Sequence, residues 1–363
     1  MRLEQRLRQD GEAPPPSEGA RAPTRVLATV RLARVLVQRI VLAMLAAGVA
    51  SSASAQTAPP LPPWSHELSD AARAGLEAND KRPPAPDSFE GRRARSEAIQ
   101  QEIGVPRLTR WKVAVDETEI AGVPVRILHR AGQGVDWRKP GPILLNLHGG
   151  GFVVDAGSLT ENVAIAAQTG LPVVAVRYRL LPDHRYPAAL EDALKVYRAL
   201  LETHDAARIG LYGTSAGAIL SGELVARLKA DELPLPGALG FFSGGSDFSR
   251  LGDSVALFAD LRGAAGLARM YSGQTALTDP VLSPARGDLS DWPPTMCVTS
   301  GRDFLQGSTA RLCSALRRAG VPAELWLYDG LPHAFWAYID APETDEAFAD
   351  MAAFLSRTVG AAR

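Results

Sequence analysis

A serine between two glycines is the feature that most constrains this sequence. Residues 213–217 read Gly-Thr-Ser-Ala-Gly and match the Gly-x-Ser-x-Gly pattern of a nucleophile elbow. Such a match arises easily by chance in a chain with 33 glycines, but here an apolar run (209–212) precedes it and a helical pattern (216–230) follows. An elbow needs small flanking residues because its serine occupies a sharp strand-to-helix turn. The pattern therefore predicts that Ser215 is an exposed nucleophile.

A run of three glycines lies upstream of the elbow. Residues 148–151 read His-Gly-Gly-Gly and follow an apolar run, 143–147. A flexible turn is the alternative interpretation, although a turn rarely needs three consecutive glycines, since each adds conformational entropy to the unfolded chain. Backbone N–H groups that no side chain blocks can hold a developing oxyanion. A nucleophile and an oxyanion site together predict a serine hydrolase that acts on esters.

The candidate general base is His333. In hydrolases built on such an elbow, the acid and then the histidine follow the serine along the chain. Of the six histidines, His333 alone lies after Ser215. It comes just past the apolar run 325–328, and open α/β sheets place their sites at such carboxyl ends of strands. A histidine in a surface loop is the alternative.

The candidate acid is Asp303. It follows the apolar run 296–298 and precedes a helix-like segment, 308–320, so it also lies at a strand-to-helix switch. A helix N-cap or turn aspartate is the competing interpretation, because aspartate is common at such junctions. Asp279 is a weaker candidate, since it precedes a proline in a turn-like stretch with no apolar strand before it.

These three residues predict a covalent mechanism. Ser215 attacks the ester carbonyl, His333 takes its proton and later returns it to the leaving alcohol, and Asp303 orients the imidazole and stabilises its cation. Water then hydrolyses the acyl-enzyme. Because a protonated imidazole cannot act as the base, we expect activity to be lost as the pH falls.

Alternating patterns predict the fold class. Helix-like stretches such as 188–201 separate short apolar runs, which implies an α/β fold with a mostly parallel sheet and helices on both faces. Residues 111–115 and 123–128 are expected to be antiparallel edge strands, because the turn between them is too short for a crossover. The other predicted strands are 143–147, 172–176, 209–212, 239–242, 296–298 and 325–328.

As a set, the motifs resemble the hormone-sensitive-lipase-like family of α/β-hydrolases, in the branch whose elbow reads Gly-Thr-Ser-Ala-Gly. The resemblance covers roughly residues 110–358. It implies an α/β-hydrolase fold with a mostly parallel eight-stranded sheet, flanking helices and a helical cap. The matching residues are His148-Gly-Gly-Gly-Phe152, Tyr178-Arg-Leu-Leu-Pro-Asp183, Tyr186-Pro-Ala-Ala-Leu-Glu-Asp192, Gly213-Thr-Ser-Ala-Gly217, Asp279-Pro-Val-Leu-Ser-Pro284, Asp303 and His333.

The resemblance also implies an activity and a set of roles. It implies a carboxylesterase for short- to medium-chain acyl esters that needs no metal and no cofactor. The oxyanion donors would be the N–H groups of Gly150, Gly151 and Ala216, and His148 would be structural. The cap would come from roughly residues 64–105 and 246–282.

Other acyl substrates stay open at this point. A carbohydrate deacetylase, a lactonase or an amidase would use the same three residues, and nothing in the sequence separates them. A ligand-binding relative without catalysis is disfavoured, because Ser215, Asp303 and His333 are all present.

The N-terminus carries the pattern of a secretory signal peptide. Several arginines precede an uncharged apolar core, 40–50, and Ser-Ser-Ala-Ser-Ala55 follows before Gln56. We therefore expect cleavage near Ala55/Gln56 and a periplasmic or secreted protein. An uncleaved anchor is the alternative, although the apolar core is too short to span a bilayer stably.

The predicted division of the chain has three parts. Residues 1–55 form an N-terminal extension and signal peptide, and residues 56–105 form a linker and N-terminal cap segment. Residues 106–363 form the catalytic domain, with a cap insertion at about 246–282. After cleavage, 308 of the 363 residues are left, enough for one large α/β domain with a cap.

Charge and cysteine content limit the partners. The first 55 residues hold eight Arg and four acidic residues, so the net charge changes from −1 for the whole chain to −5 after cleavage. A mildly acidic chain without a basic run gives no reason to expect nucleic-acid binding. We expect a small-molecule ester as partner and no stable membrane span after cleavage, and a homodimer is one option for assembly. Cys297 and Cys313 are expected to be free buried thiols, with a disulfide as the alternative.

Overall fold

An eight-stranded sheet organises the part of the chain that the structure describes. The computed structural model describes residues 63–64, 67–132 and 135–361, and these belong to one compact unit. The predicted signal peptide and its cleavage site lie outside the described residues. The strand order is β1-β2-β4-β3-β5-β6-β7-β8. The strands are β1 (Val113–Ile120), β2 (Val123–Arg130), β3 (Ile143–Leu147), β4 (Val173–Val176), β5 (Ile209–Thr214), β6 (Ala238–Phe242), β7 (Thr295–Arg302) and β8 (Ala323–Pro332).

The pairing of the strands confirms the predicted sheet. Strand β1 pairs antiparallel with β2, and β2 pairs antiparallel with β4. All further pairs, from β4 through to β8, are parallel. Strands β3 to β6 are buried along their whole length, as expected of parallel strands covered on both faces.

The largest differences from the predicted strand boundaries are in β1, β7 and β8. The strand predicted at 111–115 begins at Val113, because Trp111 still belongs to a helix and Lys112 caps it in the left-handed conformation. Strand β7 runs beyond the apolar run 296–298 and β8 runs beyond 325–328, since their ladder continues to the pair Arg302 and Pro332. Polar residues can extend a parallel ladder, so a strand predicted from its apolar run alone comes out too short.

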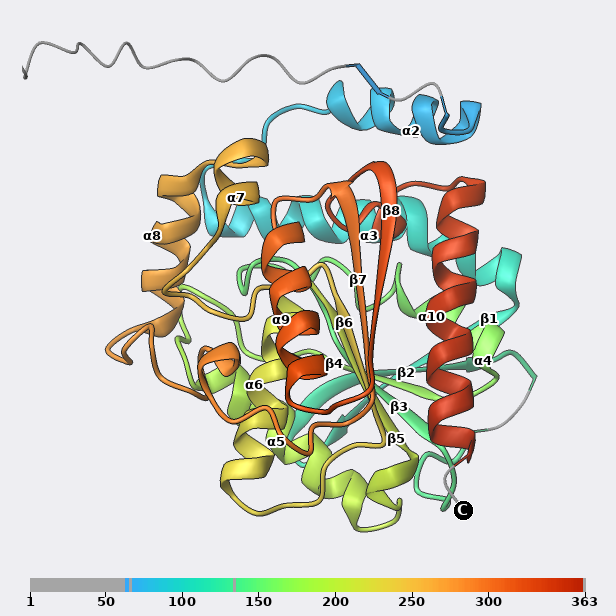
Figure 1. Cartoon of the computed structure of the whole chain (residues 1–363). Helices are drawn as coiled ribbons and strands as arrows, with labels where there is room; N and C mark the ends of the chain where they lie inside the picture. The colour runs from blue at the N-terminus through green and yellow to red at the C-terminus, as the bar shows by residue number, and fades with distance from the viewer. Residues whose placement is uncertain (1–62, 65–66, 133–134, 362–363) are drawn as a thin grey trace, which may run out of the picture. The chain divides into compact units, whose positions relative to one another are not determined.

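Helices cover both faces of the sheet (Figure 1). One buried cluster joins the sheet to α5, α6 and α9, and a second cluster joins the other face to α4 and α10. Helices α3, α7 and α8 lie at one end of the sheet (Figure 1). The helices are α2 (Asp70–Asp80), α3 (Phe89–Trp111), α4 (Asn162–Thr169), α5 (Ala188–Leu201), α6 (Ala216–Ala230), α7 (Asp253–Phe258), α8 (Leu261–Ser272), α9 (Gln306–Arg318) and α10 (Pro342–Ala361).

Two further findings concern the described residues. Among them, no helix combines the length and apolar character that crossing a membrane requires. Cys297 in β7 and Cys313 in α9 are buried and free, as predicted.

Candidate active site

Ser215 occupies the turn between β5 and α6. Its φ of 59° and ψ of −120° are a strained combination for a residue with a side chain, and its N–H donates to the carbonyl of Phe242 on the neighbouring strand at 2.9 Å. A Cβ on Gly217 would lie 1.8 Å from the carbonyl oxygen of Leu147. The elbow therefore requires glycine at this position because α6 begins in contact with the end of β3.

His333 and Asp303 complete a chain of hydrogen bonds with Ser215. His333 Nε2 lies 2.9 Å from Ser215 Oγ, and His333 Nδ1 lies 2.6 Å from Asp303 Oδ1. Asp303 directly follows β7, and His333 directly follows β8. The structure thus brings together the three residues that the sequence singled out, at the carboxyl ends of three parallel strands.

The surroundings of Asp303 keep its carboxylate charged. Burial opposes the charged form, but the neighbouring His333 ring and several hydrogen bonds outweigh it, so the pKa of Asp303 lies below its ordinary value. The donors include the Thr299 hydroxyl at 2.9 Å and the Leu305 N–H at 2.8 Å. A buried, oriented carboxylate of this kind fixes the imidazole with its Nδ1 proton toward the acid.

The glycine run passes directly beside the elbow. A Cβ on Gly149 would lie 3.0 Å from the carbonyl oxygen of Thr214. Gly150 has a φ of +116°, and a Cβ there would lie 2.1 Å from the carbonyl oxygen of Val154. The backbone at this point needs glycine both for its conformation and for its close packing. Gly151 has a φ of +63° and lines the same cavity as Ser215.

The cavity next to Ser215 is almost entirely apolar. It measures about 110 Å³ and lies between the elbow and helices α7 and α8. A wider groove of about 730 Å³ meets it at Gly151 and is bounded by α3, Gly150 and α8. The apolar cavity is lined by Gly151, Phe152, Ser215, Ala216, Ile219, Phe248, Leu251, Val255, Leu267, Tyr271 and Leu305, among others.

A buried acid behind this cavity was not singled out from the sequence. Tyr271 of α8 stacks on Phe152, with ring centroids 3.6 Å apart, and donates its hydroxyl to Glu223 Oε2 at 2.7 Å. Glu223 is fully buried in α6, and burial raises its pKa well above the ordinary value. The sequence signal for it is a glutamate within the apolar face of the predicted helix 216–230. The pair ties α8 to the helix that begins at the nucleophile.

Asp279, the weaker candidate acid, and His148, which the resemblance implies to be structural, do not join the triad. Asp279 Oδ1 accepts the N–H groups of Val281 and Leu282, which makes it a turn residue. His148 stacks on Tyr178, and its Nδ1 lies 2.8 Å from the carbonyl oxygen of Gly149. Within the described residues, no group of three or more His, Cys, Asp or Glu side chains is arranged to hold a metal ion.

Glu161 lies behind the elbow and predicts an unusual dependence of stability on pH. Burial raises its pKa to about 8, with Asp155 adding to the rise and Thr214 and Arg107 opposing it. Between its ordinary pKa of 4.5 and about 8, the folded chain keeps a proton that the unfolded chain releases. The free energy of unfolding therefore decreases as the pH rises through this window.

Glu161→Gln removes the titrating carboxyl group and with it this loss of stability at high pH. We expect the variant to have a higher Tm than the wild type at pH 8 and a much smaller difference near pH 4.5, in thermal unfolding followed by circular dichroism. Glu202→Gln, at an exposed position, is the control and should show no such trend. An equal Tm difference at both pH values would contradict a buried, protonated Glu161.

Comparison with known proteins gives matches in sequence and in structure. A family model described as alpha/beta hydrolase fold matches residues 144–337. An acetyl-hydrolase of Streptomyces hygroscopicus is 31% identical over 271 residues, which cover 69% of this chain and 90% of that protein. The crystal structure of esterase E25 superposes with a TM-score of 0.71 at 32% identity, covering 84% of this chain and 98% of that chain. That of an esterase from the bacterial hormone-sensitive lipase family gives 0.70 at 26%, covering 80% and 98%.

Proposed function

This chain belongs to the α/β-hydrolase family, among its hormone-sensitive-lipase-like carboxylic ester hydrolases, and on that premise we propose that it hydrolyses short- to medium-chain acyl esters through an acyl-enzyme on Ser215. The observation that carries the proposal is the chain of hydrogen bonds from Ser215 through His333 to Asp303. Ser215, at the end of this chain of hydrogen bonds, lines an apolar cavity.

The geometry around Ser215 supports this mechanism. His333 Nε2, 2.9 Å from Ser215 Oγ, accepts the hydroxyl proton as the oxygen attacks the ester carbonyl. The N–H groups of Gly150, Gly151 and Ala216 hold the negative charge on the former carbonyl oxygen. The intermediate expels the alcohol, which takes the proton from His333. Water, deprotonated by the same imidazole, then attacks the acyl carbonyl, and the imidazolium returns the proton to Ser215 Oγ as the acid leaves.

The apolar cavity beside Ser215 and the groove that meets it support the expected substrate range. The apolar cavity is small and closed in by α7 and α8, which favours a short or medium acyl chain over a long one. The groove on the α3 side is wider and is the place we assign to the alcohol. The relative named acetyl-hydrolase acts at the short end of this range by its name.

A series of p-nitrophenyl esters from acetate to palmitate tests the proposal. We expect kcat/KM to be highest at or below medium chain length and to fall steeply for the long esters, because their acyl chains exceed the cavity. Release of p-nitrophenolate is followed by absorbance. A maximum at palmitate would contradict the substrate range, and no turnover on any ester by a folded protein would favour a deacetylase or a lactonase.

Export is part of the proposal. The charged segment, short apolar core and Ala-x-Ala-like site at residues 31–55 support cleavage and a periplasmic or secreted location. N-terminal sequencing of the protein made in a Gram-negative host tests this. A mature N-terminus far from Gln56 would contradict it.

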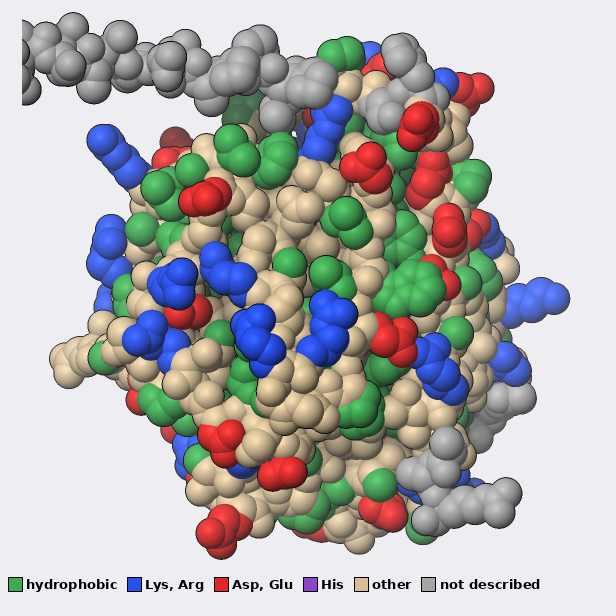
Figure 2. Space-filling view, viewed as in Figure 1, with side chains coloured by type: hydrophobic (Ala, Val, Ile, Leu, Met, Phe, Trp, Pro, Cys, Tyr) green, Lys and Arg blue, Asp and Glu red, His purple; other side chains and the backbone are tan. Residues whose placement is uncertain are grey.

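Assembly as a homodimer is also part of the proposal. Strand β8 ends the sheet and exposes three consecutive apolar side chains, Leu325, Trp326 and Leu327. Figure 2 shows hydrophobic side chains on the surface over β7 and β8. An open edge strand of this kind favours pairing with the same strand of a second copy. A mass of one chain by light scattering, at all concentrations tested, would contradict a dimer.

A further inference from the structure

One face of helix α3 binds the backbone of the segment that follows the glycine run. The residues on this face are spaced by three or four positions, which places them in one line along a helix. The line consists of Arg93, Ser96, Gln100, Gly104 and Arg107. All of them contact residues between Val153 and Thr160.

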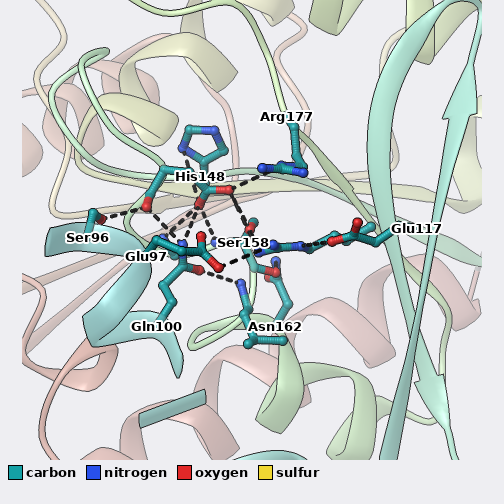
Figure 3. A network of polar contacts seen from close by, with 12 residues as sticks. Ser96, Glu97, Gln100, Glu117, His148, Ser158, Asn162 and Arg177 are labelled. Atoms are coloured by element: carbon teal, nitrogen blue, oxygen red, sulfur yellow. Dashed lines mark hydrogen bonds and ion pairs between the residues drawn. The ribbon is translucent and has the colours of Figure 1, made fainter. Parts of the chain in front are cut away.

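Gln100 makes the central contacts of this line. Its Nε2 donates to the carbonyl oxygen of Asp155 at 2.9 Å, and its Oε1 accepts the N–H of Leu159 at 2.9 Å. Ser96 Oγ donates to the same Asp155 carbonyl at 2.7 Å. Only 1% of Gln100 is exposed, so water cannot replace these bonds without a change in packing. Figure 3 shows Ser96 and Gln100 pointing from α3 into the network that contains His148 and Ser158.

The segment that α3 contacts, residues 153–160, in turn forms hydrogen bonds with the glycine run. The N–H of Ala156 donates to the carbonyl of Gly149 at 3.2 Å, and the N–H of Val154 donates to the carbonyl of Gly150 at 3.1 Å. These bonds set the planes of the peptide units that carry the N–H groups of Gly150 and Gly151. A shift of Asp155 is therefore transmitted to the oxyanion donors within two peptide units.

The far end of α3 contacts the loop of the general base. Arg107 is 2% exposed and donates to the carbonyls of Thr160 at 2.7 Å and Trp336 at 2.9 Å, and to that of Ile339 at 3.0 Å. Trp336 lies three residues after His333. One helix thus joins the backbone beyond the glycine run to the backbone beyond the histidine.

We propose that α3 is a positioning element of the active site and that Gln100 is the residue through which it aligns the oxyanion donors. This rests on the ester hydrolysis proposed above. An oxyanion hole acts in the transition state and requires its donors 2.7–3.1 Å from the oxyanion. A displaced donor therefore lowers kcat and kcat/KM together and leaves ground-state binding of the ester unchanged.

Gln100→Leu tests the proposal because it keeps much of the side-chain volume and removes all three hydrogen bonds of the side chain, two to Asp155 and one from Leu159. We expect kcat on p-nitrophenyl butyrate to fall on the order of 10- to 100-fold, the range expected of a small misalignment at a reacting centre, with KM within about two-fold. Gln101→Leu is the matched control. Gln101 is exposed, and among the described residues its side chain bonds only to Glu97 of its own helix, so its variant should keep wild-type kinetics.

A purely structural role would lower Tm without this split between kcat and KM, so Tm is measured beside the kinetics. If Gln100→Leu fails to fold, Ser96→Ala is the test of the proposal, since it removes one hydrogen bond to the Asp155 carbonyl. We expect it to give a smaller loss of kcat in the same direction. An unchanged kcat, or a raised KM with unchanged kcat, in a folded variant would overturn the proposal.

Hydrogen exchange of peptides covering residues 146–160 separates this proposal from the proposed function. We expect faster exchange of the amides at 149–156 in Gln100→Leu than in wild type or Gln101→Leu, whatever the substrate. Unchanged exchange would count against positioning by α3. An inactive wild type with faster exchange in the variant would contradict only the ester substrate.

Discussion

Replacing Ser215 with alanine is expected to lower kcat for ester hydrolysis by roughly 10⁶-fold, the size of effect found when the nucleophile of such a triad is removed. The reason is that no other hydroxyl of the site lies within hydrogen-bonding distance of His333 Nε2 among the described residues. The measurement is the steady-state rate on p-nitrophenyl butyrate, with the acid-quenched blank subtracted.

Ser221→Ala is the matched control for this variant. Ser221 lies in α6, and in the part of the chain that the structure describes its hydroxyl donates only to the carbonyl of Gly217 in the same helix, so its loss should leave the rate near that of wild type. A Ser215→Ala protein that keeps more than about a hundredth of the wild-type kcat, an effect too small for the loss of a nucleophile, would exclude Ser215 from that role.

Replacing Asp303 with asparagine is expected to lower kcat/KM by about 10⁴-fold at neutral pH. An amide presents N–H groups or a weaker acceptor to His333 Nδ1, so the imidazole no longer holds its proton on that nitrogen. Nε2 then carries the proton and cannot accept the one on Ser215 Oγ. The loss also removes the charge that stabilises the imidazolium, a charge that the lowered pKa of Asp303 maintains across the pH range of activity.

A second variant, Asp279→Asn, distinguishes Asp303 from the weaker candidate acid. Asp303 has a lowered pKa, which favours its charged carboxylate. Asp279→Asn is the control, because an amide oxygen can still accept the N–H groups of Val281 and Leu282. A large loss in Asp279→Asn together with little loss in Asp303→Asn would move the acid to Asp279.

Local patterns were enough to predict the elements that carry the triad. The predicted helices 188–201 and 216–230 coincide with α5 and α6. Ser215, Asp303 and His333 each follow a strand that an apolar run marks, and parallel strands bring their carboxyl ends to one edge of a sheet. Chain order and strand position therefore determine most of this site.

Contacts between distant segments were beyond the reach of those patterns. Helix α3 continues to Trp111 through Pro106, although a proline usually marks a helix end, and the predicted boundary at 105/106 falls inside it. The bonds of Gln100 to Asp155 and of Tyr271 to Glu223 join residues 55 and 48 positions apart. No periodicity links such pairs, because each depends on how α3, α6 and α8 pack against other parts of the fold.

A covalent trap reports most directly on Ser215 as the nucleophile. Diethyl p-nitrophenyl phosphate offers a phosphorus that Ser215 Oγ attacks with expulsion of p-nitrophenolate, which leaves a stable diethylphosphoryl ester on the serine. We expect one adduct per chain by intact mass, on the peptide that contains residues 213–217, with complete loss of esterase activity. An adduct on another residue, or full modification of the Ser215→Ala variant, would contradict the assignment.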